Sequence, residues 1–105
     1  MTAGKDHVSA RERRVDERYA VRLDAVVRAY RMPTLAASLL DISAGGAMIE
    51  ADAGAYQLGE EVTFSAAGSE LVATIAWLND QFIGLAFHRR LGTRELGRFR
   101  KAGQS

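Results

Sequence analysis

The feature that most restricts the fold of this chain is a series of six short β-rich runs separated by turn residues. In the first run, VRLDAVVRAY (residues 21–30), apolar residues alternate with mostly polar ones, which is the period-2 pattern of a half-buried strand. Comparable runs cover residues 34–42, 46–51, 61–66, 70–78 and 82–87. Short strands with turn signals between them predict an antiparallel barrel or sandwich rather than a βαβ fold.

The length of 105 residues predicts one domain. We expect a flexible N-terminal tail over residues 1–12, a barrel with an arginine-bearing arm over residues 13–89, and a helix and tail over residues 90–105. Thr93 is the expected N-cap of the helix, and Leu96 and Phe99 share one of its faces. The helix is expected to cover one mouth of the barrel; the alternative is a basic surface that contacts a partner.

The residues give little support to catalysis or metal binding. The chain has no cysteine, which excludes disulfides, a thiolate nucleophile and cysteine-based metal sites. His7 and His88 are paired with no serine nucleophile, and there is no phosphate-binding loop of the GxxxxGK[ST] kind. No apolar run reaches the roughly 18 residues of a membrane span. We therefore expect a cytoplasmic binding protein without catalytic residues, metal or cofactor.

Charge is distributed unevenly along the chain. Residues 1–31 carry eight Lys and Arg against five Asp and Glu, and residues 89–105 carry six basic residues against one acid. Residues 32–88 carry seven acids and no Lys or Arg. An anionic ligand must therefore be held by cationic side chains from the two ends of the chain. The alternative is that the charges only keep the protein soluble.

Two arginines before the first strand have a spacing that suits such a ligand. Arg14 and Arg18 are four residues apart, so they share one face of a helical turn, about 5–6 Å apart. They also share one side of an extended chain, roughly 13 Å apart. Because the chain has twelve arginines, the pair alone is weak evidence, and a solvated charged arm is the alternative.

The stretch DISAGG, residues 41–46, adds groups that could recognise a guanine. Arginine forks match phosphate oxygens and the O6/N7 edge of guanine, and the Asp41 carboxylate can accept from the guanine ring N–H and amine. Ser43 adds a hydroxyl, and Gly45 and Gly46 leave room for a base or sugar-phosphate close to the backbone. Turn chemistry alone would also explain Asp, Ser and Gly here.

Together these motifs resemble the PilZ domain, a bacterial receptor domain for cyclic di-GMP. RxxxR at Arg14 and Arg18 precedes a strand, YAVRLDAVV, and DxSxxG follows at Asp41, Ser43 and Gly46. VATIAWL and IGLAF resemble the closing strands of that family, so the similarity extends from about residue 13 to residue 89. It implies a six-stranded antiparallel β-barrel with a flanking helix and no catalytic activity.

The resemblance also implies roles for individual residues. Arg14 and Arg18 would hold phosphates and guanine edges, and the DxSxxG residues would contact the other guanine side. Arg13 would stack on or bond to a second ligand copy. Trp77 would pack beside the ligand; the alternative for this tryptophan is packing in the core or at the barrel rim. The expected ligand-binding residues are therefore Arg13, Arg14, Arg18, Asp41, Ser43, Gly45, Gly46 and Trp77.

A domain without catalytic groups would signal by contacting something else. We expect cyclic di-GMP to order the arm over residues 11–18, which has only one aliphatic residue, Val15, and an unidentified protein partner to read the altered face. One alternative is a PilZ-like interaction module that binds no nucleotide. Another is a small barrel for single-stranded nucleic acid, but the acidic strands with few aromatic residues argue against it.

Overall fold

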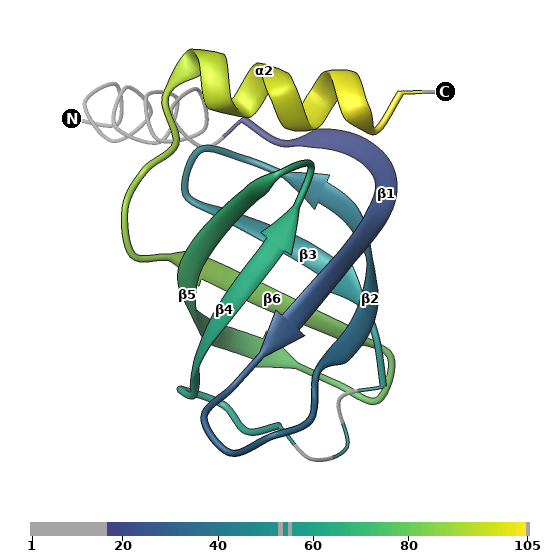
Figure 1. Cartoon of the computed structure of the whole chain (residues 1–105), viewed down its shortest axis with the longest axis vertical. Helices are drawn as coiled ribbons and strands as arrows, with labels where there is room; N and C mark the ends of the chain where they lie inside the picture. Colours follow the sequence, from purple (N-terminus) through teal and green to yellow (C-terminus); the bar gives the residue numbers. More distant parts are fainter. Residues whose placement is uncertain (1–16, 53, 55, 105) are drawn as a thin grey trace, which may run out of the picture.

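The computed structural model describes residues 17–104, except residues 53 and 55. Six antiparallel strands close into a barrel, and one helix lies across an end of it in this part of the chain (Figure 1). The order around the barrel is β1-β2-β3-β6-β5-β4. The elements are β1 (Tyr19–Arg28), β2 (Leu35–Ile42), β3 (Gly46–Glu50), β4 (Glu61–Ala66), β5 (Ser69–Leu78), β6 (Phe82–Phe87) and α2 (Thr93–Ala102). The predicted six-stranded antiparallel β-barrel with a short C-terminal helix is confirmed.

Every predicted strand is present, and its ends lie within two residues of the expected ones. The largest difference is in the first strand, which ends at Arg28 because the chain turns there. Arg31 has a φ of 61°, and the Met32 amide donates to the Ala29 carbonyl at 3.1 Å.

Alternating residues of the strands fill the barrel. In β1 the predicted inward residues Val21, Ala25 and Val27 are buried, while Val26 between them is exposed. Strand residues of this kind stabilise the barrel chiefly by removing apolar surface from water. The buried apolar residues are Val21, Ala25, Val27, Ala29, Leu39, Ile42, Ala47, Ile49, Tyr56, Val62, Phe64, Ala66, Leu71, Ala73, Ile75, Ile83, Leu85, Leu91 and Phe99.

Besides a register shift between Ala20 and Leu23, where β1 pairs with β2, two irregularities in the strand pairing interrupt this alternation. Between β2 and β3 the register shifts between Leu39 and Asp41. Between β5 and β6 it shifts between Ile75 and Trp77. A β-bulge inserts one residue into a strand and thereby changes which face the following side chains occupy. Both bulges directly precede residues that the sequence singled out as ligand contacts.

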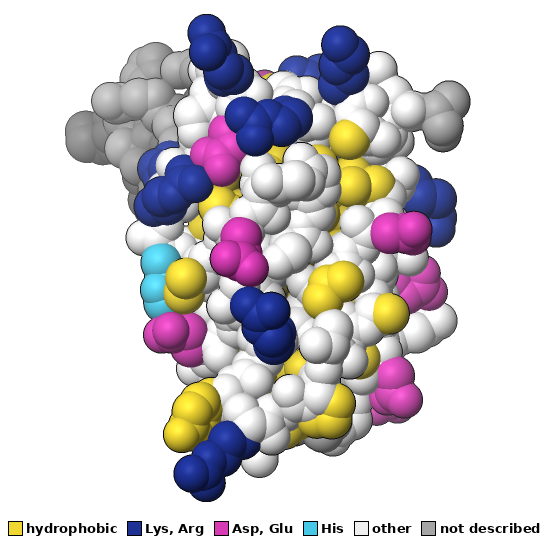
Figure 2. Space-filling model, viewed as in Figure 1, with side chains coloured by type: hydrophobic (Ala, Val, Ile, Leu, Met, Phe, Trp, Pro, Cys, Tyr) yellow, Lys and Arg dark blue, Asp and Glu magenta, His cyan; other side chains and the backbone are white. Residues whose placement is uncertain are grey.

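The helix α2 covers one end of the barrel, as predicted (Figure 1). Its residue Phe99 is fully buried and stacks on Phe64 of β4 at a ring-centroid distance of 6.3 Å. At the C-terminal end of the helix, the Arg22 amide donates to the Gly103 carbonyl at 3.2 Å. The guanidinium of Arg100 lies over the ring of Tyr19 at 3.8 Å from the centroid. These contacts fix the helix to β1 and β4. Several Lys and Arg side chains gather on the surface at this end of the molecule (Figure 2).

The predicted N-cap of α2 was wrong by one residue. The N-cap is Gly92, in an extended conformation and without a side-chain cap, and Thr93 is the first helical residue. The physical reason lies just before the helix, where Leu91 is buried and its amide donates to the Ala44 carbonyl at 2.8 Å. This tertiary contact, rather than the capping preference of Thr93, sets where the helix begins.

Candidate ligand-binding site

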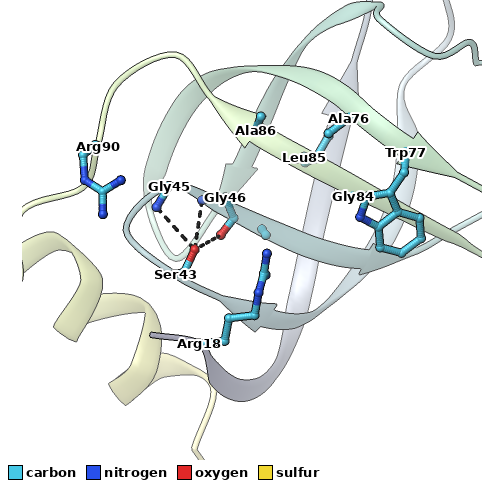
Figure 3. Close-up of a pocket in the computed structure, with 11 residues that line it drawn as sticks. Arg18, Ser43, Gly45, Gly46, Ala76, Trp77, Gly84, Leu85, Ala86 and Arg90 are labelled. Atoms are coloured by element: carbon cyan, nitrogen blue, oxygen red, sulfur yellow. Dashed lines mark hydrogen bonds between the residues drawn. The ribbon is translucent and has the colours of Figure 1, made fainter. Parts of the chain in front are cut away.

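A pocket of about 350 Å³ lies on the outer side of the barrel, where β3, β5 and β6 meet the turn between β2 and β3. Arg18 and Arg90 approach it from the two ends of the chain, and Trp77 stands at another edge (Figure 3). Its floor consists of small residues and backbone. The lining residues are Arg18, Ser43, Gly45, Gly46, Ala47, Ala76, Trp77, Gly84, Leu85, Ala86 and Arg90.

Ser43 holds the turn of the DxSxxG motif in shape. Its side chain is buried, with the residue 1% exposed. The hydroxyl accepts from the amides of Gly45 at 3.3 Å and Gly46 at 3.1 Å, and it donates to the Gly46 carbonyl at 3.3 Å (Figure 3). A serine hydroxyl has one donor and two lone pairs, so these bonds use its full capacity. The geometry makes Ser43 the residue that shapes the turn.

The lack of a side chain at Gly46 has a structural cause. A Cβ at this position would overlap the carbonyl oxygen of Leu85 on β6, because Gly46 pairs with Ala86 where β3 and β6 approach closely. The sequence suggested that glycine makes room here for a ligand. In the structure the neighbouring strand occupies that room, while Gly45 and Gly46 still line the pocket.

The same turn is tied to the segment that follows β6. The Phe87 amide donates to the Gly45 carbonyl at 2.9 Å, and the Leu91 amide donates to the Ala44 carbonyl at 2.8 Å. These two bonds bracket residues 88–90 and place Arg90 at the pocket. Sequence reasoning missed Arg90 as a site residue. The uneven charge distribution indicated that cations from the C-terminal end should contribute, but it did not distinguish among the six basic residues there.

A second contact fixes this segment to the helix. Arg89 donates to both carboxylate oxygens of Glu95 at 2.9 Å. These hydrogen bonds favour the ionised carboxylate and lower the pKa of Glu95, and they raise the pKa of Arg89. The pair connects the residue beside Arg90 to the first turn of α2.

Arg18 and Asp41, the two charged motif residues that the structure describes, form an ion pair. Arg18 Nη1 donates to Asp41 Oδ1 at 3.0 Å. Arg18 also lines the pocket, whereas Asp41 stands beside it through this pair. The structure therefore brings Arg18, the last residue of the predicted arm, against the first residue of the DxSxxG motif. Arg13 and Arg14 lie outside the described residues.

Trp77 is 43% exposed, so core packing is wrong, while packing at the barrel rim remains the alternative to contact with a ligand. The bulge after Ile75 is the reason: Ala76 and Trp77 are both exposed, and only Leu78 returns to pack on the core. The Trp77 indole lies against Gly84 of β6 at the edge of the pocket (Figure 3). An exposed indole face is available to a flat apolar or aromatic group.

Three further features concern other classes of function. Within the residues that the structure describes, no group of three or more His, Cys, Asp and Glu could hold a metal ion. His88 bonds to the hydroxyl of Thr74 at 2.8 Å. In the same part of the chain, no helix has the length and apolarity needed to cross a membrane.

The pocket thus combines two cations, an exposed indole and a floor of small residues, a combination suited to a flat anionic ligand. Comparison with known families agrees with this reading: the model of the PilZ domain matches residues 12–100. No curated protein matches the chain. PilZ domains are binding or adaptor domains and are generally cyclic di-GMP receptors. Because the match covers most of the sequence and the barrel has the expected form, the chain belongs to the PilZ domain family.

Proposed function

We propose that this protein binds cyclic di-GMP at the pocket beside the DxSxxG turn. The observation that carries the proposal is the convergence of Arg18 and Arg90 on one pocket from opposite ends of the chain. Between residues 32 and 88 the sequence offers no Lys or Arg. Among the described residues, the two cations that line the pocket, Arg18 and Arg90, come from the segments before β1 and after β6.

Each group has a chemical role in this proposal. The guanidinium groups of Arg18 and Arg90 bind phosphate oxygens or the O6/N7 edge of guanine. The carboxylate of Asp41 accepts from the ring N–H and amine of guanine, and the Trp77 indole packs against a base. Ser43 acts indirectly, by holding the turn that carries the backbone of Gly45 and Gly46.

The arm that precedes β1 adds the remaining contacts. By similarity to the family motif, Arg14 binds the same ligand as Arg18, and Arg13 bonds to a second ligand copy. The described residues supply no pairing of a nucleophile with a base at the pocket, and we propose binding without catalysis. The output is a change in the arm that an unidentified protein partner reads.

Calorimetric titration with cyclic di-GMP and cyclic di-AMP tests the binding proposal. We expect low-micromolar or tighter affinity for cyclic di-GMP. Cyclic di-AMP should bind more weakly, because adenine carries an amine where guanine carries O6. Equal affinity for both dinucleotides would contradict the guanine-reading role of Asp41. Absence of binding would favour a PilZ-like interaction module that binds no nucleotide. Binding to single-stranded RNA that falls steeply with salt would instead favour a nucleic-acid barrel.

Amide hydrogen exchange tests the proposed output separately. Cyclic di-GMP should increase protection of residues 11–18 together with the turn at residues 41–46. The ligand supplies the counter-charge that lets the charged arm recover its ordering cost, on the order of 1–2 kcal/mol per residue. An arm that is equally protected with and without the ligand would rule out this output and leave the binding proposal intact.

A further inference from the structure

The position of the Trp77 indole depends on a single residue of the neighbouring strand. Trp77 and Gly84 are paired across β5 and β6. A Cβ on Gly84 would overlap Nε1 and Cε2 of the indole. The indole therefore occupies the space that any side chain at position 84 would take. Gly84 is itself buried, although its two strand neighbours Ile83 and Leu85 are the residues that face the core.

The bulge in β5 and the glycine in β6 act together on this indole. The bulge turns Trp77 to the outer face, and the glycine lets the ring lie down on that face. Any larger residue at position 84 would leave no space for the ring there. In its present position the ring forms one edge of the pocket whose other edges carry Arg18 and Arg90 (Figure 3).

We propose that Gly84 is a positioning residue that holds the Trp77 indole against the sheet, so that its exposed face lines the ligand pocket. Part of this inference rests on the proposed function, because the ligand that packs on the indole is cyclic di-GMP. The positioning itself does not depend on the ligand. It follows from the overlap between the indole and a side chain at position 84.

A substitution at Gly84 can displace the indole without disturbing the barrel. Gly84 is not among the described residues with positive φ, so an alanine there is compatible with the backbone. The three atoms nearest to that methyl group all belong to the Trp77 side chain, which is partly exposed and can rotate away. The expected response to Gly84→Ala is therefore movement of the ring.

The chain contains one tryptophan, so its fluorescence reports on this ring alone. In Gly84→Ala we expect a red-shifted emission maximum and stronger quenching by acrylamide, both measured without ligand. Gly97→Ala is the matched control, because a Cβ at Gly97 meets nothing within 4 Å, and its spectrum should equal that of the wild type. An unchanged spectrum in Gly84→Ala would overturn the positioning role.

A double-mutant cycle with Trp77→Ala tests whether Gly84 acts through the indole. Cyclic di-GMP affinity should fall about tenfold in Gly84→Ala and in Trp77→Ala, which is within the range for stacking of one base on an aromatic ring. The double variant should lose no more than either single variant. Additive losses would mean that Gly84 acts through another contact and would overturn the inference.

Thermal unfolding provides a readout that does not require the ligand. Any destabilisation by Gly84→Ala should disappear in the Trp77→Ala background, where the methyl group meets no ring. Equal destabilisation in both backgrounds would overturn the inference. If the wild-type protein fails to bind cyclic di-GMP, the proposed function fails. The spectra and the unfolding cycle then still decide whether Gly84 positions Trp77.

Discussion

Arg18 donates a hydrogen bond to Asp41 at 3.0 Å and thereby joins the arginine arm to the DxSxxG motif across the start of β1 and the end of β2. The Arg18 side chain is 56% exposed, and ion pairs of this kind contribute only about 0–1 kcal/mol to stability. The pair therefore holds the two side chains together only weakly. In the proposed complex, a phosphate or a guanine edge would replace or share the carboxylate as the partner of Arg18.

This exposure leads to the first prediction. Arg18→Ala should weaken binding of cyclic di-GMP about tenfold or more, because a charge-assisted hydrogen bond contributes roughly 1.5–3 kcal/mol. Arg14→Ala should behave in the same way. The midpoint of thermal unfolding without ligand should hardly change for Arg18→Ala, since the ion pair contributes little. Calorimetry measures the affinity, and thermal unfolding measures the stability. A large loss of stability with intact binding would show a structural role instead.

The second prediction separates Arg90 from its neighbours in the basic C-terminal segment. Arg90 lines the pocket, whereas Arg94 on α2 does not. Arg90→Ala should reduce affinity for cyclic di-GMP about tenfold, and Arg94→Ala, which removes the same charge, should leave it nearly unchanged. Equal losses in the two variants would mean that only the overall charge of the segment matters. Titrations of both variants at one salt concentration decide between these outcomes.

The third prediction concerns base selectivity. Asp41→Asn keeps the shape of the side chain but replaces a carboxylate oxygen with an amide donor. The ratio of affinities for cyclic di-GMP and cyclic di-AMP should therefore fall, because guanine presents donors to this position. Competition titrations with both dinucleotides measure the ratio. A ratio that is unchanged while both affinities shift together would assign Asp41 to holding Arg18 alone.

The fourth prediction distinguishes Ser43 from the arginines. Ser43→Ala removes the acceptor of the Gly45 and Gly46 amides within a buried turn. Leaving buried donors without a partner costs about 1–3 kcal/mol, so the free energy of unfolding should fall without any ligand present. Chemical denaturation measures the loss. Unchanged stability together with reduced affinity would show that Ser43 acts on the ligand directly.

The fifth prediction is a pH dependence at the segment that carries Arg90. The pKa of Glu95 is lowered by its hydrogen bonds from Arg89. The Arg89–Glu95 pair therefore stabilises the folded state fully above the unfolded-state pKa of this carboxyl. This stabilisation is lost as the pH falls through the lowered folded-state pKa. NMR titration should show the Glu95 pKa rising toward its ordinary value in Arg89→Ala. It should stay low in Arg94→Ala, because the lowering comes first from the hydrogen bonds of Arg89 and then from the charges of Arg89 and Arg98.

Much of the fold could be predicted from the sequence. The six strands were predicted from period-2 alternation and from the turn residues between the runs. Both signals depend only on residues that are neighbours along the chain. The motif pair and its order identified the family resemblance, and the two basic ends of the chain indicated where cations would come from. Arg18 of the first motif lies beside Asp41 of the second, while the ligand contacts of the site residues and the places of Arg13 and Arg14 remain predictions.

The tertiary structure decided what the individual site residues do. Strict alternation from Leu71, Ala73 and Ile75 would point Trp77 into the core. The bulge in β5 opposite β6 instead places Trp77 on the outer face. Gly46 is small because β6 approaches it, and Arg90 reaches the pocket because two backbone bonds bracket its segment. Each outcome depends on a partner strand or turn distant in sequence. Local periodicity determines which residues form strands, but the pairing between strands determines where a bulge falls and which side chains meet.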